Sequence, residues 1–283
     1  MARTLKTLVD GIAFGEAPRW RDGWLYLSDI HADRVLRVAP DGAYEVVAEF
    51  GGPVSGLGWL PDGRMLVVSM HDRKLLRQEG DGFVEHADLS AIATWHANDM
   101  VVASDGTAYV GNFGFRIFPT RDEPRPAAIA KVSPEGGVSV AADNFWFPNG
   151  AVITPDGTTL IVAESGAKCL TALDIADDGS LTNRRLWGQM QENQLPDGIC
   201  LDAEGAIWIA SPPSREVIRM AQGGEVLEVI ATEQEAIACM LGGSDRRTLF
   251  ILTAEGRDPT WCRENHSARV LSTEVEIAGA GLP

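Results

Sequence analysis

Six copies of one short pattern, an acidic turn followed by a run of β-forming residues, are spaced along the whole sequence and restrict its possible folds. The copies start at Asp22, Asp62, Asp105, Asp156, Glu204 and Asp245, with steps of 40, 43, 51, 48 and 41 residues. Five of these residues precede a glycine, and Asp-Gly between apolar β-formers indicates a hairpin. A period of about 40–50 residues is typical of one four-stranded propeller blade.

A second hairpin completes each unit, as residues 34–38 and 44–47 do around Asp41-Gly42. We therefore predict an all-β fold, a six-bladed β-propeller with four antiparallel strands per blade, as one domain over residues 1–283. A β-sandwich is the alternative, but six near-equal units favour radial repetition. Residues 268–275 can supply the last strand, and the segment near residues 5–9 can pair into the same blade, which would leave no free sheet edge.

Composition excludes several classes of partner. The formal charge of −16 opposes binding to nucleic acid or to an anionic membrane. No stretch has the length of a signal peptide or a membrane span, so we expect a cytoplasmic protein, as a monomer or weak homo-oligomer. Cys169, Cys200 and Cys239 lie in apolar runs and are predicted to be buried thiols, whereas Cys262, beside Arg263 and Glu264, is expected to be exposed.

The start of each unit's first strand, about seven residues before its turn, borders the central channel of a propeller. The residues at this position are Glu16, Ser55, Asn98, Asn149, Asp197 and Ala238. Carboxylates crowded together in a buried place repel each other unless they are protonated or bind a cation. The sequence therefore predicts a metal at the central channel, held by Glu16, Asn149 and Asp197 with Asn98 as a fourth ligand.

The type of ion follows from the ligand atoms. Oxygen-only ligation favours one divalent ion such as Ca²⁺, with Mg²⁺ and Mn²⁺ as alternatives, and carboxylates do not exclude Zn²⁺. The competing interpretation is that Asn149-Gly150 and Asp197-Gly198 are merely turns.

Five short motifs also carry a family resemblance. They are Glu16-Ala17-Pro18-Arg19-Trp20, Asn98-Asp99-Met100, Phe147-Pro148-Asn149-Gly150, Pro196-Asp197-Gly198 and 238–243. In order and spacing, from about residue 8 to the C-terminus, the chain resembles the family of senescence marker protein, gluconolactonase and luciferin-regenerating enzyme. The resemblance implies lactone hydrolysis in a six-bladed propeller, a metal on Glu16, Asn149 and Asp197, Asn98 near metal and substrate, and Asp197 as the base.

One residue departs from the pattern of the sugar-lactone members of that family. They often carry an arginine two residues before the Asn98 position, where this chain has His96. Two residues apart in a strand means the same face, so His96 is predicted to face the substrate cavity, unless it is only part of the wall. A smaller or less hydroxylated lactone is then expected.

Other substrate contacts are predicted from blade geometry. Connections between second and third strands open on the same face as the starts of the first strands, so His71, Phe113 and Phe115 should surround the metal. Trp146 reaches the same rim, and residues 116–128 form a candidate lid. These aromatic side chains would otherwise serve only in packing.

The predicted reaction is the opening of a lactone by water. A divalent cation can polarise the ester carbonyl while Asp197 orients or deprotonates the water, or acts only as a ligand. The sequence contains no Gly-x-Ser-x-Gly nucleophile motif. The alternatives are a phosphotriester hydrolase of the same fold and a metal-binding regulatory propeller without catalysis.

Overall fold

The computed structural model describes residues 3–117 and 120–282 of the chain. The acidic turns take the local form that their residues favour. In the second unit Gly63 has φ of +90°, a backbone conformation that glycine adopts without steric cost, and its N–H donates to the Leu60 carbonyl at 2.9 Å. Asp62 Oδ1 accepts a hydrogen bond from Arg64 N at 3.0 Å, which closes the turn and fixes the register of the hairpin.

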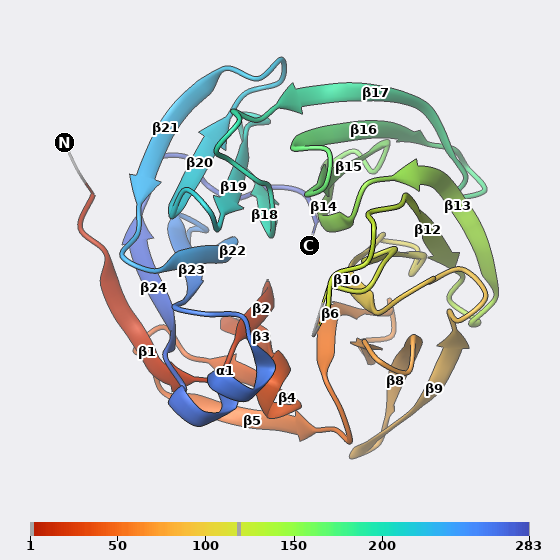
Figure 1. Cartoon of the computed structure of the whole chain (residues 1–283), viewed down its shortest axis with the longest axis horizontal. Coiled ribbons are helices and arrows are strands. Elements are labelled where there is room, and N and C mark those ends of the chain that lie inside the picture. Colours follow the sequence, from red (N-terminus) through yellow and green to blue (C-terminus); the bar gives the residue numbers. More distant parts are fainter. Residues whose placement is uncertain (1–2, 118–119, 283) are drawn as a thin grey trace.

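The strands form six four-stranded antiparallel sheets around one axis, as predicted (Figure 1). The innermost strands are β2 (Gly15–Arg21), β6 (Val54–Trp59), β10 (Ala97–Val102), β14 (Pro148–Ile153), β18 (Ile199–Leu201) and β22 (Glu235–Gly242). The second strands are β3 (Trp24–Asp29), β7 (Met65–Ser69), β11 (Ala108–Asn112), β15 (Thr159–Glu164), β19 (Ile207–Ser211) and β23 (Thr248–Ala254). We number the blades 1 to 6 in this order.

The outer half of each sheet follows the same order. The third strands are β4 (Arg34–Val38), β8 (Lys74–Glu79), β12 (Ala127–Val132), β16 (Cys169–Ile175), β20 (Glu216–Met220) and β24 (Ala268–Glu274). The outermost are β5 (Tyr44–Glu49), β9 (Gly82–Asp88), β13 (Val138–Phe145), β17 (Leu181–Gln189), β21 (Val226–Ala231) and β1 (Lys6–Ile12).

The two ends of the chain close the ring in one sheet. The N-terminal β1 pairs antiparallel with the C-terminal β24, with Lys6 opposite Ser272, and the order of that sheet is β1-β24-β23-β22. The predicted pairing of the N-terminal segment into the last blade is therefore confirmed. β1 thereby covers the outer edge of β24 and joins the two ends of the chain in one blade.

Glycines let the innermost strands approach one another at the axis. A Cβ on Gly198 would lie 2.4 Å from the Ala238 Cβ on β22, and one on Gly150 would lie 2.7 Å from the Asp197 carbonyl oxygen. Gly150 lies inside β14, and neither glycine has the positive φ of a turn residue. The interpretation of Asn149-Gly150 and Asp197-Gly198 as turns is wrong, because these glycines serve close packing between blades.

The four cysteine side chains are all buried by the packing of the blades and of α1. Cys169, Cys200 and Cys239 are buried as predicted. The expectation for Cys262 is wrong. Its side chain is fully buried on the inner side of the short helix α1 (Pro259–Asn265), and its Sγ donates to the Gly256 carbonyl at 3.2 Å. Among the described residues, no helix is both long and apolar enough to cross a membrane.

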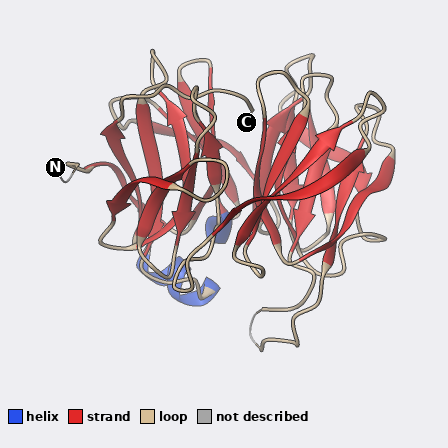
Figure 2. Cartoon of the chain, turned by 90° about the horizontal axis from the view of Figure 1, so that it is seen from above, coloured by secondary structure: helices blue, strands red, loops and turns tan. Residues whose placement is uncertain are grey.

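The two faces of the propeller carry different elements. Figure 2 shows α1 and the long connection between β11 and β12 on one face, with the C-terminus on the opposite face. On that opposite face Leu282 bridges Ile153 and Gly279 bridges Asp202, so the C-terminal segment crosses from blade 6 to blades 5 and 4. The short 3₁₀ helix η1 (Ile30–Ala32) contacts α1, so both lie on the first face.

Candidate functional site at the channel

Three of the predicted site positions lie at irregular points in the innermost strands, and the fourth, Asp197, lies two residues before β18. Pairing with the second strand shifts register just after Glu16 in β2, between Ala97 and Met100 in β10, and between Pro148 and Ala151 in β14. Such bulges turn a side chain out of the alternation of a regular strand and recur beside active sites. The same device at equivalent places explains how successive blades direct polar side chains to one place.

Three of the predicted residues form a continuous chain of hydrogen bonds between blades. Asn98 Nδ2 donates to Asn149 Oδ1 at 3.0 Å, and Asn149 Nδ2 donates to Asp197 Oδ1 at 2.5 Å. Asn149 Nδ2 also donates to Ser165 Oγ at 3.2 Å, and Ser165 Oγ donates to the Pro196 carbonyl at 2.6 Å. The structure thus brings side chains of blades 3, 4 and 5 together.

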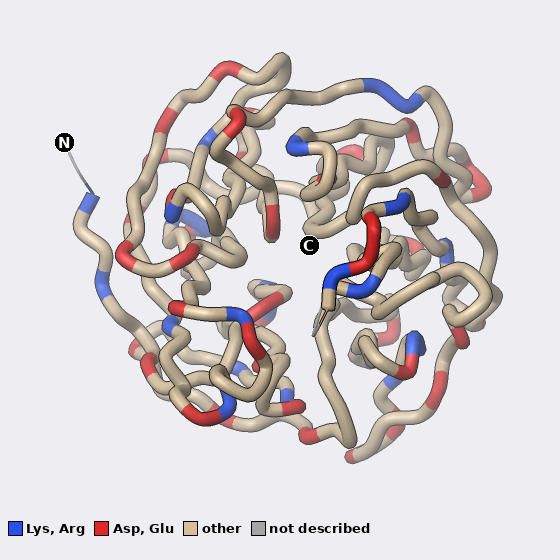
Figure 3. Tube along the Cα trace, in the orientation of Figure 1, with Lys and Arg blue, Asp and Glu red and all other residues tan. Residues whose placement is uncertain are grey.

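Glu16 joins this cluster from blade 1. Its side chain is buried and its Oε2 accepts a hydrogen bond from Ala17 N at 2.8 Å. Ala17 has φ of +49°, a conformation that costs energy in a residue with a Cβ and is found more often at functional sites than elsewhere. Figure 3 shows acidic segments near the axis, at the inner ends of β2 and β18.

Asp99, the residue after Asn98, has a cationic partner, whereas the two carboxylates of the predicted metal site have none in the described part of the chain. Arg19 Nη2 lies 2.6 Å from Asp99 Oδ1, and both side chains are buried. Glu16 and Asp197 take part in no ion pair within the described part of the chain. Burial and the neighbouring charge of Asp197 raise the pKa of Glu16 well above its usual value. Burial raises the pKa of Asp197 to about 7, opposed by Arg257 and the Asn149 hydrogen bond and reinforced by Asp99 and Glu235.

A divalent cation fits this donor set. Glu16 is buried and Asp197 is partly exposed, and two largely desolvated carboxylates with raised pKa values are the arrangement in which a bound cation would offset the cost of burying charge. The Asn149 amide carries an oxygen and a nitrogen of similar shape, so after a half-turn its oxygen can face a cation. Across residues 3–117 and 120–282, no three His, Cys, Asp or Glu side chains cluster as a metal-binding group. The donors that the predicted residues offer are carboxylate and amide oxygens, which suit a hard, oxygen-binding ion better than one that prefers imidazole or thiolate ligands.

A row of rings runs beside these polar residues. His96 lies with ring centroids 4.6 Å from Trp95, 4.1 Å from His71 and 6.0 Å from Phe113. Phe113 continues the row to Phe147 at 4.6 Å. Predicted residues of blades 2 and 3 therefore meet on the face that carries the connections from second to third strands.

The two histidines of the row are held in the neutral form. Burial lowers the pKa of His96 to about 4, with smaller effects of His71 and the positive charge of Arg73. Burial also lowers the pKa of His71. At neutral pH His96 is therefore an uncharged ring that can donate one hydrogen bond and accept another.

The other predicted contacts lie in different surroundings. Phe115 is only 3% exposed and has its ring 6.4 Å from Phe147, so it is part of the packing below the rim. Trp146 is 39% exposed, and Phe147 rather than Trp146 belongs to the row of rings. The candidate lid ends at residue 126 because β12 starts at Ala127; its residues 118 and 119 lie outside the described residues.

Sequence reasoning missed two charged residues at this face. Arg257, between β23 and α1, and Glu235, the first residue of β22, both act on the charge of Asp197. The order of the strands could have pointed to Arg257, because residues 255–267 connect the second strand of blade 6 to its third strand. The same rule that pointed to His71 and Phe113 applies to this connection.

Comparison with known proteins gives one consistent picture. A family model described as "SMP-30/Gluconolactonase/LRE-like region" matches residues 14–255. A 6-deoxy-6-sulfogluconolactonase from Pseudomonas putida is 25% identical over 301 residues, covering 100% of this chain and 99% of that protein.

Two solved structures share the propeller. A calcium-binding protein, regucalcin, from Agrobacterium tumefaciens has a TM-score of 0.83 and 20% identity, covering 100% of this chain and 97% of its own. A gluconolactonase from Xanthomonas campestris has a TM-score of 0.75 and 25% identity, covering 99% and 90%.

Proposed function

The chain belongs to the SMP-30/gluconolactonase/LRE-like family, and on that premise we propose that it is a metal-dependent lactonase. The observation that carries the proposal is a pair of carboxylates that has no cationic partner among the described residues: Glu16, which is buried, and Asp197, which is largely buried and joined to the amides of Asn149 and Asn98. The similarity to proteins named as sugar lactonases supports a cyclic ester as the substrate.

Glu16, Asn149 and Asp197 would hold the ion, with Asn98 as a fourth ligand or a substrate contact. Ca²⁺ suits these hard oxygen donors, and the name of the regucalcin structure, a calcium-binding protein, agrees with that choice. When bound, the ion supplies Lewis-acid polarisation of the ester carbonyl.

The side chains of this chain supply the remaining chemistry. Asp197 retains partial exposure and can accept a proton from an attacking water, provided that it is deprotonated. Asn98, in blade 3, offers an amide group to the substrate. Its Nδ2 donates a hydrogen bond to Asn149 Oδ1 at 3.0 Å. His96 and Phe113 offer a neutral, mainly apolar wall, which favours a ring with few hydroxyl groups.

The test is an activity panel on protein that has been stripped with a chelator and reloaded with Ca²⁺, Mg²⁺, Mn²⁺ or Zn²⁺. The panel contains a sugar lactone, an aliphatic lactone and an organophosphate triester, with acid release followed by an indicator. We expect lactone turnover only after metal is restored, and a loss of about 100-fold or more in kcat for Asp197→Asn.

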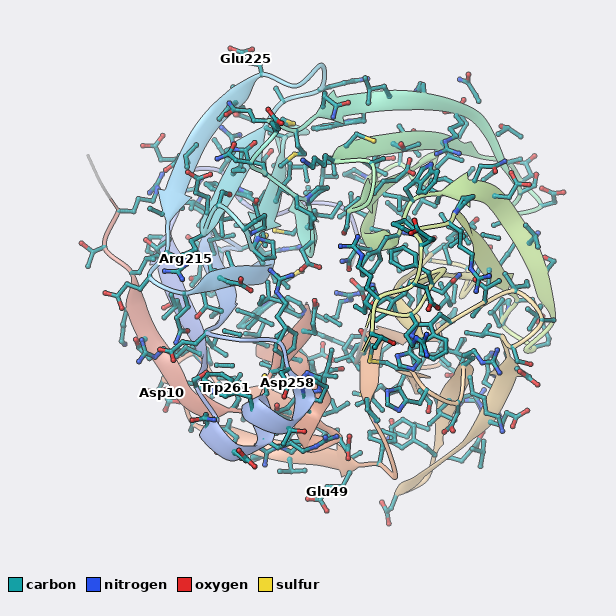
Figure 4. The ribbon with its side chains drawn as sticks, viewed as in Figure 1. Asp10, Glu49, Arg215, Glu225, Asp258 and Trp261 are labelled. Atoms are coloured by element: carbon teal, nitrogen blue, oxygen red, sulfur yellow. The ribbon has the colours of Figure 1, made fainter. Side chains whose placement is uncertain are left out.

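The matched control is Asp10→Asn, at an exposed carboxylate that Figure 4 shows at the outer edge of the ring. This variant should keep full activity. Turnover of the phosphotriester alone would show that the protein hydrolyses a phosphate ester bond instead of the ester bond of a lactone. Retained metal without turnover on any ester would indicate a binding or regulatory propeller.

A further inference from the structure

The turn that leads from β23 into α1 places a positive charge beside the candidate site. Arg257 lies in this turn, and its Nε donates to Glu235 Oε2 at 2.6 Å. The two side chains are 40% and 27% exposed, so the pair stands at the surface of the face rather than in the core. Glu235 is the first residue of β22, three positions before Ala238, the blade 6 residue at the channel.

The strand that begins with Glu235 runs beside Asp197. The N–H of Gly198, the residue after Asp197, donates to the Ile237 carbonyl at 3.0 Å, and Ile237 lies two residues after Glu235 in β22. In agreement with this placement, the positive charge of Arg257 opposes the rise in the pKa of Asp197, and the Glu235 charge reinforces it. Within the part of the chain that the structure describes, Arg257 is hydrogen-bonded and ion-paired to Glu235, not to Asp197. Through Glu235 and β22, the guanidinium is therefore placed on the blade next to Asp197 without being paired to it.

The turn is anchored from three sides. Asp258 caps α1 by accepting a hydrogen bond from Trp261 N at 2.9 Å, and both residues are labelled in Figure 4. The Trp261 ring lies against Gly256, and Cys262 Sγ donates to the Gly256 carbonyl at 3.2 Å. The backbone of Arg257 is therefore held in place before any ligand arrives, which lowers the entropy lost on binding.

The donors that remain on Arg257 suit an oxyanion. Glu235 accepts from Nε, and across the described residues neither Nη group of Arg257 has a hydrogen-bond partner. A guanidinium presents its terminal N–H groups in a planar fork that matches a carboxylate. The overall charge of −16 repels anions from the molecule as a whole, so selection of an anion here has to be local.

We propose that Arg257 is a specificity-determining residue that binds an anionic substituent, such as a carboxylate, on the lactone substrate. The inference rests on the proposed function and adds the substrate class, a lactone that carries a negative charge beside its ring. The ester would lie at Asp197, and the charged substituent would point toward Arg257 on the neighbouring blade. Glu235 orients the guanidinium through Nε.

This role has a kinetic signature that a merely structural ion pair lacks. The substituent does not change in the chemical step, so its contact with Arg257 stabilises ground state and transition state alike. In metal-loaded protein, where the ion would keep Asp197 deprotonated whether or not Arg257 is present, loss of the guanidinium should therefore raise KM for a charged lactone and leave kcat nearly unchanged. The effect should weaken at high salt, because the side chain is partly exposed.

The experiment compares a γ-lactone bearing a ring carboxylate with its uncharged carboxamide, on metal-loaded wild type, Arg257→Gln and Arg257→Lys. Arg257→Gln should lose about tenfold or more in kcat/KM on the carboxylate and about twofold or less on the amide. Arg257→Lys should restore part of the loss, since it restores the charge without the fork.

The matched control is Arg215→Gln, an exposed arginine on the same face that Figure 4 shows away from the axis. It changes the net charge equally and should leave the ratio between the two substrates unaltered. The inference is overturned if Arg257→Gln lowers activity on both lactones equally or on neither, or if Arg215→Gln shifts the ratio as much.

Failure of the proposed function can be separated from failure of this inference. If wild type hydrolyses neither lactone, calorimetric titration with glutarate and with glutaramide tests whether Arg257 still recognises an anion. Tighter binding of glutarate that disappears in Arg257→Gln supports anion recognition in a protein without lactonase activity. Equal or absent binding of the two compounds overturns the inference.

Discussion

Removal of the metal should leave a protein whose stability falls as the pH rises. The free carboxyl of Asp197 has a pKa of about 7 in the folded chain, against an ordinary value of 3.8. Between these values the folded state keeps the proton and the unfolded state has released it, so the free energy of unfolding decreases with pH. Stability from this group is therefore full below about pH 4 and lost above about pH 7.

The magnitude follows from the two values. The difference between about 7 and 3.8 is about 3 pH units, each worth about 1.4 kcal/mol, so Asp197 should cost the metal-free protein about 4 kcal/mol in mild alkali. Glu16 contributes in the same direction, because burial also raises its pKa. Bound metal removes the effect, since it stabilises the deprotonated ligands.

The assay is urea denaturation of chelator-treated protein at several pH values, followed by tryptophan fluorescence. Asp197→Asn cannot titrate, so the stability difference between wild type and this variant should grow by about 4 kcal/mol between about pH 4 and about pH 8. Asp10→Asn reports the background from exposed carboxylates. A wild-type minus Asp197→Asn difference that does not depend on pH would refute the buried-carboxylate argument, and with it the reason for placing a cation here.

Three further results are expected. Asp197→Ala should abolish metal retention by elemental analysis, and undiminished metal content would contradict the ligand assignment. His96→Arg should shift the kcat/KM ratio toward polyhydroxylated lactones by about tenfold, or about 1.4 kcal/mol, because arginine adds a fork of donors; an unchanged ratio in His96→Arg and His96→Ala would make His96 part of the wall only. Arg19→Ala should lower the free energy of unfolding by about 3–5 kcal/mol, measured in urea, because it leaves buried Asp99 without its partner at 2.6 Å; a smaller loss than that of an exposed ion pair would be inconsistent with this reasoning.

The sequence predicted the fold well because the signals for a blade are local. An Asp-Gly turn fixes a hairpin by its own backbone, as Asp62 and Gly63 do, and the repeat spacing then gives the number of blades. The positions of Asn98, Asn149 and Asp197 were also within reach, since equivalent places in repeats face the same axis. Their hydrogen-bonded chain agrees with that reasoning.

Other features depended on which surfaces the blades bury against one another. Cys262 lies among charged residues in the sequence, yet the docking of α1 buries it completely. The neutral state of His96 follows from its burial beside His71, a residue of another blade. Phe115 is packed below the rim and Phe147 belongs to the row of rings for the same reason, because neighbouring rings decide which side chain stays at the rim.

By itself, the sequence determined a ring of six blades and the polar residues that each blade directs to the axis, because turns and strand periodicity are properties of short segments. Only the tertiary structure decided the charge of these groups and brought Arg257 to the edge of the site. Desolvation and charge interactions act through space between blades, and no local pattern around Arg257 records that Asp197 is its neighbour.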